Sequence, residues 1–131
     1  SPWIICIENP DTQNSKPIGC LSKKDDEKYM AVATSGDYRN FFTIDNKRYS
    51  HTIDPKTGFP ISNNLSSVSV ALPGQFRHTG DADALATALN VMGLKEGFEF
   101  AVNNSIAALF IIRSENEFSI RKTPSFEDII H

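Results

Sequence analysis

The sequence contains no long apolar run and no block of basic residues. Its longest apolar run, from Ile106 to Ile112, has the length of a strand and falls short of the roughly 18 residues that span a bilayer. Lys and Arg together number 13 against 16 Asp and Glu, which gives a formal net charge of -3. Proteins that bind nucleic acid usually carry a dense Lys/Arg surface, so this balance disfavours a nucleic-acid partner.

Cysteine is scarce as well. Cys6 and Cys20 are the only two in the sequence, and their separation matches no metal-binding motif such as C-x-x-C. We favour buried free thiols as the interpretation, and a cross-strand disulfide is the alternative. No secretory leader is visible, but the chain does not begin with Met and opens almost directly on a predicted strand, so this absence says nothing about the compartment.

The composition is typical of one folded domain with a real core. The chain has 131 residues, of which 40% are hydrophobic and 22% are charged. Runs rich in β-branched and aromatic residues, separated by polar turns, predict most of the structure as short strands. These predicted strands cover residues 3–8, 18–21, 30–35, two stretches within 41–54, 66–72, 105–113 and 117–122.

Two helices are predicted between the strand at residues 66–72 and the strand at residues 105–113. The stretch 81–93, "DADALATALNVMG", has acidic residues in its first turn and a glycine at its end, which are helix start and stop signals. The stretch 94–103 is predicted as a second short helix, interrupted by Gly97. The order of strands, helices and strands predicts an α+β fold, with two short helices packed on a largely antiparallel sheet.

The first predicted helix carries a polar line. Asp83, Thr87 and Asn90 fall on one side of it, opposite an apolar face. That face would be formed by Leu85, Ala88, Leu89 and Met92. A carboxylate and a hydroxyl one turn apart can give two hard oxygens to Mg²⁺, which usually completes its shell with water and substrate phosphates. From spacing alone, the same line is more often simply the solvent side of an ordinary surface helix.

The stretch Tyr49–Pro60, "YSHTIDPKTGFP", predicts a tight turn. Asp54, Pro55 and Gly58 are the residues that such a turn requires, and Thr57 can bond to its backbone. The turn does not require His51, whose imidazole could move protons near neutral pH, although a lone histidine on a strand is more often structural.

Four stretches in order resemble the ApbE family of FAD:protein FMN transferases: "VATSGDYRNFF", "KRYSHTIDPKTGFP", "LSSVSVAL" and "DADALATALNVMG". The closing stretch "LFIIRSENEFSIRKTPSF" is similar to the end of the family's sequences. The resemblance implies an enzyme that uses Mg²⁺ and transfers FMN from FAD to a threonine of an acceptor protein, as a phosphoester, with release of AMP. Some family members are said to hydrolyse FAD to FMN and AMP instead.

The resemblance also assigns roles to individual residues. Asp83 and Thr87 match the family's side-chain metal ligands, His51 matches the histidine associated with catalysis, and Ile53 lies where the family's chain touches FAD. The segment 35–39 matches a region near the flavin, without individual roles. Two other functions stay open: a module that binds or hydrolyses FAD without protein transfer, and a metal-independent interaction domain in which Asp83 and Thr87 are helix surface.

The resemblance covers nearly the whole chain, but family members are about twice this length or more. We therefore expect residues 1–131 to be the C-terminal portion of a flavin transferase, with the N-terminal half of the flavin pocket absent. We favour a fragment of a longer protein as the explanation, and a natural chain that has lost its partner half is the alternative. Alone, such a portion should bind FAD weakly and could self-associate through uncovered apolar surface. The resemblance also implies an extracytoplasmic location, periplasmic or membrane-anchored through the absent region. The acceptor protein is not identifiable from the sequence.

Overall fold

The computed structural model describes residues 4–10, 16–22, 30–36, 41–44, 47–50, 53–59, 65–73, 79–114 and 117–131. The strands are β1 (Ile4–Ile7), β2 (Gly19–Ser22), β3 (Met30–Gly36), β4 (Phe41–Ile44), β5 (Lys47–Ser50), β6 (Leu65–Pro73), β7 (Ala107–Ser114) and β8 (Glu117–Lys122). The helices are α1 (Thr79–Asn103) and α2 (Pro124–Glu127). Within these residues no helix is both long and apolar enough to cross a membrane.

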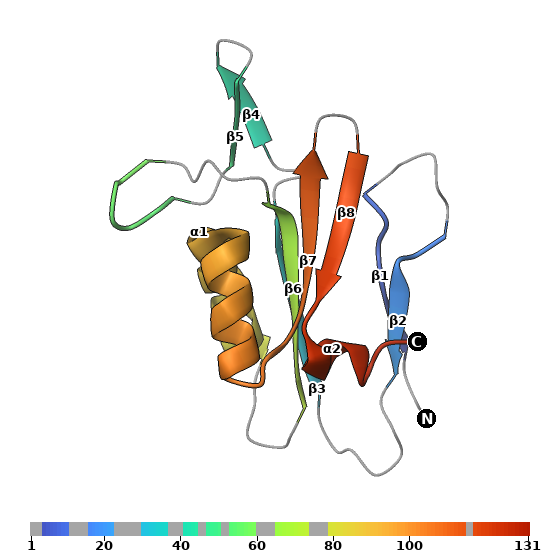
Figure 1. Ribbon diagram of the computed structural model, residues 1–131. Helices are drawn as coiled ribbons and strands as arrows, with labels where there is room; N and C mark the ends of the chain where they lie inside the picture. The colour runs from blue at the N-terminus through green and yellow to red at the C-terminus, as the bar shows by residue number, and fades with distance from the viewer. Residues whose placement is uncertain are drawn as a thin grey trace.

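A four-stranded antiparallel sheet, in the order β3-β6-β7-β8, forms the centre of the fold (Figure 1). Helix α1 packs on one side of it, against β3, β6 and β7. The two-stranded sheet β1-β2 and the short helix α2 lie on the other side. The predicted α+β fold with a largely antiparallel sheet is confirmed.

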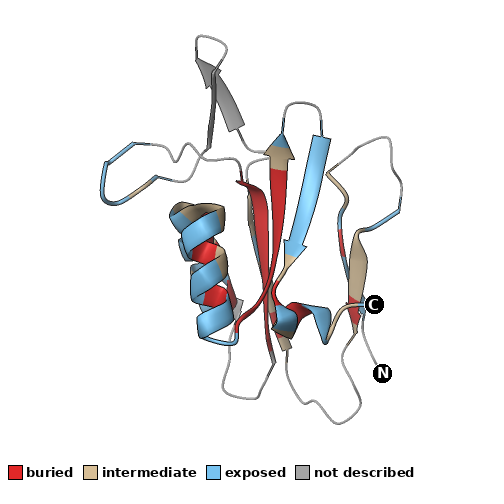
Figure 2. Ribbon diagram, viewed as in Figure 1, coloured by how far each residue is buried: buried red, intermediate tan, exposed pale blue. Residues whose placement is uncertain are grey.

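The two faces of the central sheet form two apolar clusters. Along β6 the side chains alternate, so that Val68 and Val70 face α1 whereas Ala71 faces α2 and the β1-β2 hairpin. Strands β6 and β7 are therefore buried on both faces, while β8 at the edge of the sheet is exposed (Figure 2). This burial explains the continuous apolar run that begins at Ile106, because a central strand has no solvent side.

Helix α1 consists of two helical segments that meet at Gly93, as predicted. Gly93 has φ 83° and ψ 176°, a conformation that interrupts the helix and favours glycine. The prediction that Gly97 interrupts the second segment is wrong, since Gly97 lies within regular helix. A Cβ on Gly97 would lie 2.8 Å from the carbonyl oxygen of Leu89, so this glycine allows the second segment to pack closely against the first.

The predicted faces of the first segment need correction. Ala82, Ala86 and Leu89 are its fully buried apolar residues, whereas Met92 is 36% exposed. Asn90, predicted on the polar line with Asp83 and Thr87, is buried and donates a hydrogen bond from Nδ2 to Ser35 Oγ at 3.3 Å. The small alanine side chains bring this side of the helix close to the sheet, and a serine on β3 gives the asparagine a polar partner.

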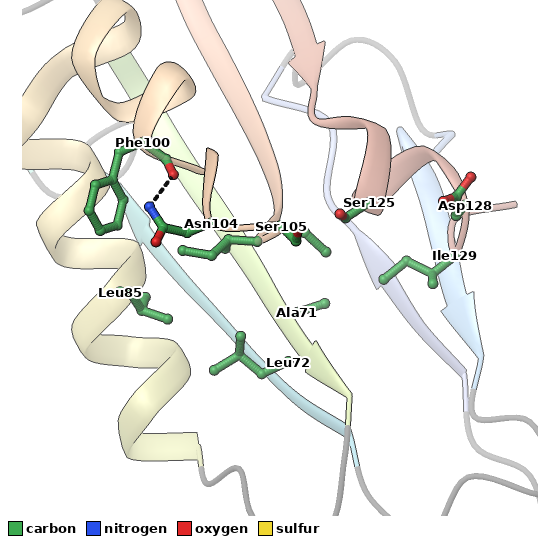
Figure 3. A pocket seen from close by; sticks show the side chains of 11 residues that line it. Ala71, Leu72, Leu85, Phe100, Asn104, Ser105, Ser125, Asp128 and Ile129 are labelled. Carbon is green, nitrogen blue, oxygen red and sulfur yellow. Dashed lines mark hydrogen bonds between the residues drawn. The ribbon is translucent and has the colours of Figure 1, made fainter. Parts of the chain in front are cut away.

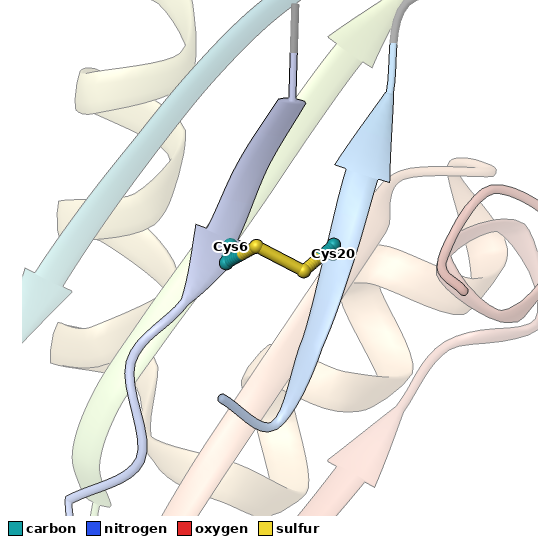
Figure 4. The surroundings of a disulfide bond; sticks show 2 residues. All are labelled: Cys6 and Cys20. Carbon is teal, nitrogen blue, oxygen red and sulfur yellow. A yellow bond between two sulfur atoms is a disulfide. The ribbon is translucent and has the colours of Figure 1, made fainter. Parts of the chain in front are cut away.

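The cysteines form a disulfide, so the favoured interpretation as buried free thiols is wrong (Figure 4). Cys6 and Cys20 are directly opposite each other in the antiparallel β1-β2 pair. Their neighbours Ile7 and Leu21 are buried in the cluster beneath the hairpin. Because successive side chains of a strand alternate, the disulfide lies on the outer face of the hairpin, outside the core.

The chain beyond β8 contains an element that the sequence did not predict. Pro124 begins the one-turn helix α2, and Phe126 of this helix is fully buried. Thr123, also buried, donates from Oγ1 to the Ile106 carbonyl oxygen at 2.8 Å and accepts the Ala108 N–H at 2.9 Å. This hydroxyl thus ties the start of α2 to the start of β7.

Candidate functional site

The segment 53–59, drawn in green in Figure 1, is a tight turn built by backbone hydrogen bonds. The Asp54 carbonyl oxygen accepts N–H bonds from Thr57 at 3.3 Å and from Gly58 at 2.8 Å, and the Asp54 N–H donates to the Phe59 carbonyl oxygen at 2.9 Å. Gly58 has φ 73°, the left-handed conformation that the sequence predicted for it. The predicted turn is confirmed.

Two side chains complete the turn. Asp54 Oδ1 accepts the backbone N–H of Lys56 at 2.9 Å, and Thr57 Oγ1 accepts that of Phe59 at 3.2 Å. Both are local bonds of the kind that aspartate and threonine form in turns. The Asp54 carboxylate therefore has a structural task within its own loop.

A groove of about 740 Å³ separates this turn from α1. From the turn it is lined by Ile53, Asp54, Pro55 and Lys56, and from α1 by Ala84, Thr87, Ala88, Val91, Met92 and Glu96. The groove thus brings Ile53 and Thr87, two of the predicted site residues, to a single concave surface. Ile53 is 51% exposed, so the groove presents an apolar side chain to the solvent there.

Lys56, Met92 and Glu96 also line the groove, and the sequence did not indicate them as site residues. Met92 was assigned to the buried face, since an apolar residue at helical spacing is usually core. No local sequence signal distinguishes a methionine that lines a groove from one that fills a core.

Asp83 is exposed and precedes Thr87, which is half-buried, by one helical turn. The two side chains therefore share one side of α1, although Asp83 itself is not among the residues that line the groove. A carboxylate and a hydroxyl suit a hard cation such as Mg²⁺. Within the described ranges there is no group of three or more His, Cys, Asp or Glu residues that could hold a metal ion. A cation at Asp83 and Thr87 would therefore need further oxygens from water, a substrate or other residues of the protein.

His51 lies outside the described residues, as do residues 37–39 of the segment matched to the flavin region. Ser35 and Gly36 end strand β3, and Ser35 accepts the hydrogen bond from Asn90. A Cβ on Gly36 would lie 2.7 Å from the Ser66 carbonyl oxygen, so β3 and β6 approach closely at this point. The bond from Asn90 therefore fixes the end of β3 to the helix that carries Thr87.

A second groove, of about 620 Å³, lies where the end of α1 approaches β6 and α2 (Figure 3). Leu72, Leu85 and Phe100 are among the apolar residues that line it. At its edge the Asn104 side chain donates to the Phe100 carbonyl oxygen at 2.8 Å, which closes the end of the helix. Neither Ile53 nor Thr87 lines this groove, so it is separate from the candidate site.

Comparison with known proteins places the chain in a family. The sequence model of the ApbE family matches residues 1–110. The chain is 37% identical over 128 residues to a FAD:protein FMN transferase of Haemophilus influenzae and 40% identical over 129 residues to one of Vibrio cholerae. Each alignment covers 98% of this chain but only 35% and 36% of the relatives, so the chain spans about a third of their length.

Solved structures give the same result. The apo form of the flavinyl transferase ApbE of Pseudomonas stutzeri matches 98% of this chain and 37% of its own, with a TM-score of 0.75 and 40% identity. The ApbE protein of Thermotoga maritima matches 99% of this chain and 38% of its own, with a TM-score of 0.75 and 30% identity. The chain therefore belongs to the ApbE family, as its motifs predicted.

Proposed function

We propose that this chain supplies part of the active site of an enzyme that transfers FMN from FAD to a threonine hydroxyl of an acceptor protein. The relatives that match it carry the name FAD:protein FMN transferase. The observation that carries the proposal is the groove that unites Ile53 with Thr87, because two motifs far apart in the sequence contribute to one concave surface.

In this proposal the acceptor threonine attacks the phosphorus that belongs to the FMN portion of FAD. A bond forms between the threonine oxygen and this phosphorus, the pyrophosphate bond breaks, and AMP leaves with the bridging oxygen. His51 accepts the proton of the threonine hydroxyl, a contribution worth about 10²–10⁴-fold in rate. The local bond of Asp54 to Lys56 supports a structural role for this aspartate, which holds the turn that follows His51.

Asp83 and Thr87 are the residues that would hold Mg²⁺. When bound, Mg²⁺ supplies stabilisation of the negative charge that develops on the phosphate oxygens. Thr87 is suited to this task because its side chain lines the groove and lies one helical turn from the Asp83 carboxylate. Ile53, exposed on the opposite wall of the groove, would contact the bound FAD.

We further propose that residues 1–131 act as the C-terminal portion of a longer transferase, in an extracytoplasmic compartment. The relatives are nearly three times as long as the chain, which leaves room for the rest of a flavin pocket. The Cys6–Cys20 disulfide supports an oxidising compartment, because disulfides persist there and are rare in the cytosol. Alone, the chain would bind FAD weakly and could self-associate through apolar side chains such as Phe59, which is 71% exposed.

An activity assay of the intact protein tests the proposal. With FAD, Mg²⁺ and an acceptor protein, we expect AMP and flavin-labelled acceptor in equal amounts. Asp83→Ala should abolish the transfer. Asp81→Ala is the matched control, because it removes the same charge from the same exposed turn but lies about 200° away around the helix.

Three results would each contradict part of the proposal. AMP without labelled acceptor would favour the alternative, a module that hydrolyses FAD, and FAD binding without either product would favour a flavin-handling module. Full transfer by Asp83→Ala would remove the metal assignment.

A further inference from the structure

The β1-β2 hairpin is a small two-stranded unit that packs beside the central sheet. Each strand has four residues, and neither is part of the central sheet. The hairpin contributes Ile7 and Leu21 to the cluster shared with α2. A two-stranded hairpin of this size is at best marginally stable by itself, so it stays ordered only through further links and packing contacts.

The Cys6–Cys20 disulfide is a covalent link across this hairpin. It closes a loop of about 15 residues, and in the chain-entropy description such a loop makes the open state about a hundredfold less populated than without the link. The hairpin is joined in turn to the segment 129–131, since Cys20 exchanges two backbone hydrogen bonds with His131, of 2.7 and 2.9 Å. The covalent link therefore influences both the hairpin and the segment that pairs with it.

The disulfide is also accessible. Cys6 is exposed and Cys20 is half-buried, and the bond lies on the outer face of the hairpin (Figure 4). Exchange requires that a thiolate approaches a disulfide sulfur, so an exposed bond on a thin hairpin meets the steric requirement that a core disulfide does not.

From these observations we propose that Cys6–Cys20 is a thiol–disulfide exchange site, open to dithiol proteins of the oxidoreductase class. The thiolate of the dithiol attacks Sγ of Cys6, the more exposed of the two residues, and forms a mixed disulfide while Cys20 leaves as a thiolate. The second thiol of the dithiol then attacks the sulfur that the first thiol contributed to the mixed disulfide, and Cys6 is released as a thiolate. Two electrons and two protons pass from the dithiol to the cysteine pair, and the dithiol becomes a disulfide.

With the bond open, the separation of β1 from β2 that uncovers Ile7 and Leu21 becomes about a hundredfold more frequent. The hairpin is therefore more ordered under oxidising conditions, with the disulfide closed, than under reducing conditions, while the central sheet stays folded in both. This site lies on the opposite side of the sheet from α1, which carries Thr87, so the inference does not depend on the proposed flavin transfer.

The test is hydrogen exchange of the protein with and without dithiothreitol, in the absence of denaturant. The Ile18 N–H donates to the Ile7 carbonyl oxygen at 2.9 Å and reports the pairing of β1 with β2. The Thr123 N–H donates to the Ala108 carbonyl oxygen at 3.0 Å and reports the central sheet. We expect dithiothreitol to reduce the bond and to accelerate exchange at Ile18 about a hundredfold, with Thr123 unchanged.

The double variant Cys6→Ser/Cys20→Ser is the control. It should show the fast Ile18 exchange at the outset and no response to dithiothreitol. Three results would each overturn the proposal: a bond that resists reduction unless the protein is denatured, an Ile18 exchange rate that reduction leaves unchanged, or equal acceleration at Ile18 and Thr123, which would mean global unfolding.

Discussion

Replacing Asp54 distinguishes a turn-building role from a catalytic one. In the structure Asp54 Oδ1 accepts the Lys56 N–H at 2.9 Å, at an exposed position. An asparagine side chain carries an equivalent oxygen, so Asp54→Asn keeps this bond and removes only the charge. Asp54→Ala removes the bond as well, while the backbone bonds between Asp54 and Gly58 or Phe59 remain.

The two roles predict effects of very different size. An exposed hydrogen bond contributes about 1 kcal/mol, so Asp54→Ala should lower the population of the closed turn by no more than about fivefold. Asp54→Asn should change it by less than about twofold. If Asp54 instead oriented His51, as the aspartate of a catalytic triad orients its histidine, the asparagine variant would lose about 10⁴-fold in kcat.

The assay is kcat/KM for FMN transfer by the intact protein at saturating Mg²⁺, followed by the fluorescence of the labelled acceptor. We expect the kcat/KM of Asp54→Asn to be close to that of the unmodified protein, and the kcat/KM of Asp54→Ala to be up to about fivefold lower. An asparagine variant that is slower by more than about a hundredfold would refute a purely structural role and indicate that Asp54 orients His51.

Two further predictions concern stability. Thr123→Val should lower the free energy of unfolding by about 2–4 kcal/mol, because it leaves the Ala108 N–H and the Ile106 carbonyl group buried without their partner. Thr123→Ser keeps the hydroxyl and should lower it by about 1 kcal/mol or less. Equal losses for the two variants in denaturant titrations would contradict this. Ser105 has φ 53°, so Ser105→Gly should raise the melting temperature by relieving about 0.5–1 kcal/mol of backbone strain, while Ser119→Gly in strand β8 should lower it. A destabilised Ser105→Gly variant would show that the left-handed conformation costs nothing here.

The parts of the fold that the sequence predicted are those decided by local chemistry. The turn at Asp54 and Gly58 depends on bonds within a few residues, and the break in α1 at Gly93 depends on one backbone conformation. Such signals are complete within a short window of sequence, so their interpretation does not require knowledge of the tertiary structure.

The errors arose where distant segments decide the result. Asn90 was placed on the solvent side of its helix because the serine that pairs with it belongs to β3, 55 positions away in the sequence. The disulfide depends on the register of β1 against β2, which puts Cys6 opposite Cys20 and which spacing alone does not give. The lining of the groove by Met92 likewise depends on how α1 lies against the turn.

The proposed metal site requires Thr87 as a ligand of Mg²⁺ at the groove. Binding of Mg²⁺ to the intact protein in the presence of FAD, measured by calorimetry, tests this with two variants of similar volume. Thr87→Val keeps the shape of the side chain but removes the oxygen, and we expect it to weaken Mg²⁺ binding by about tenfold or more, whereas Thr87→Ser should bind almost normally. Undiminished Mg²⁺ affinity in Thr87→Val would contradict the proposed metal site.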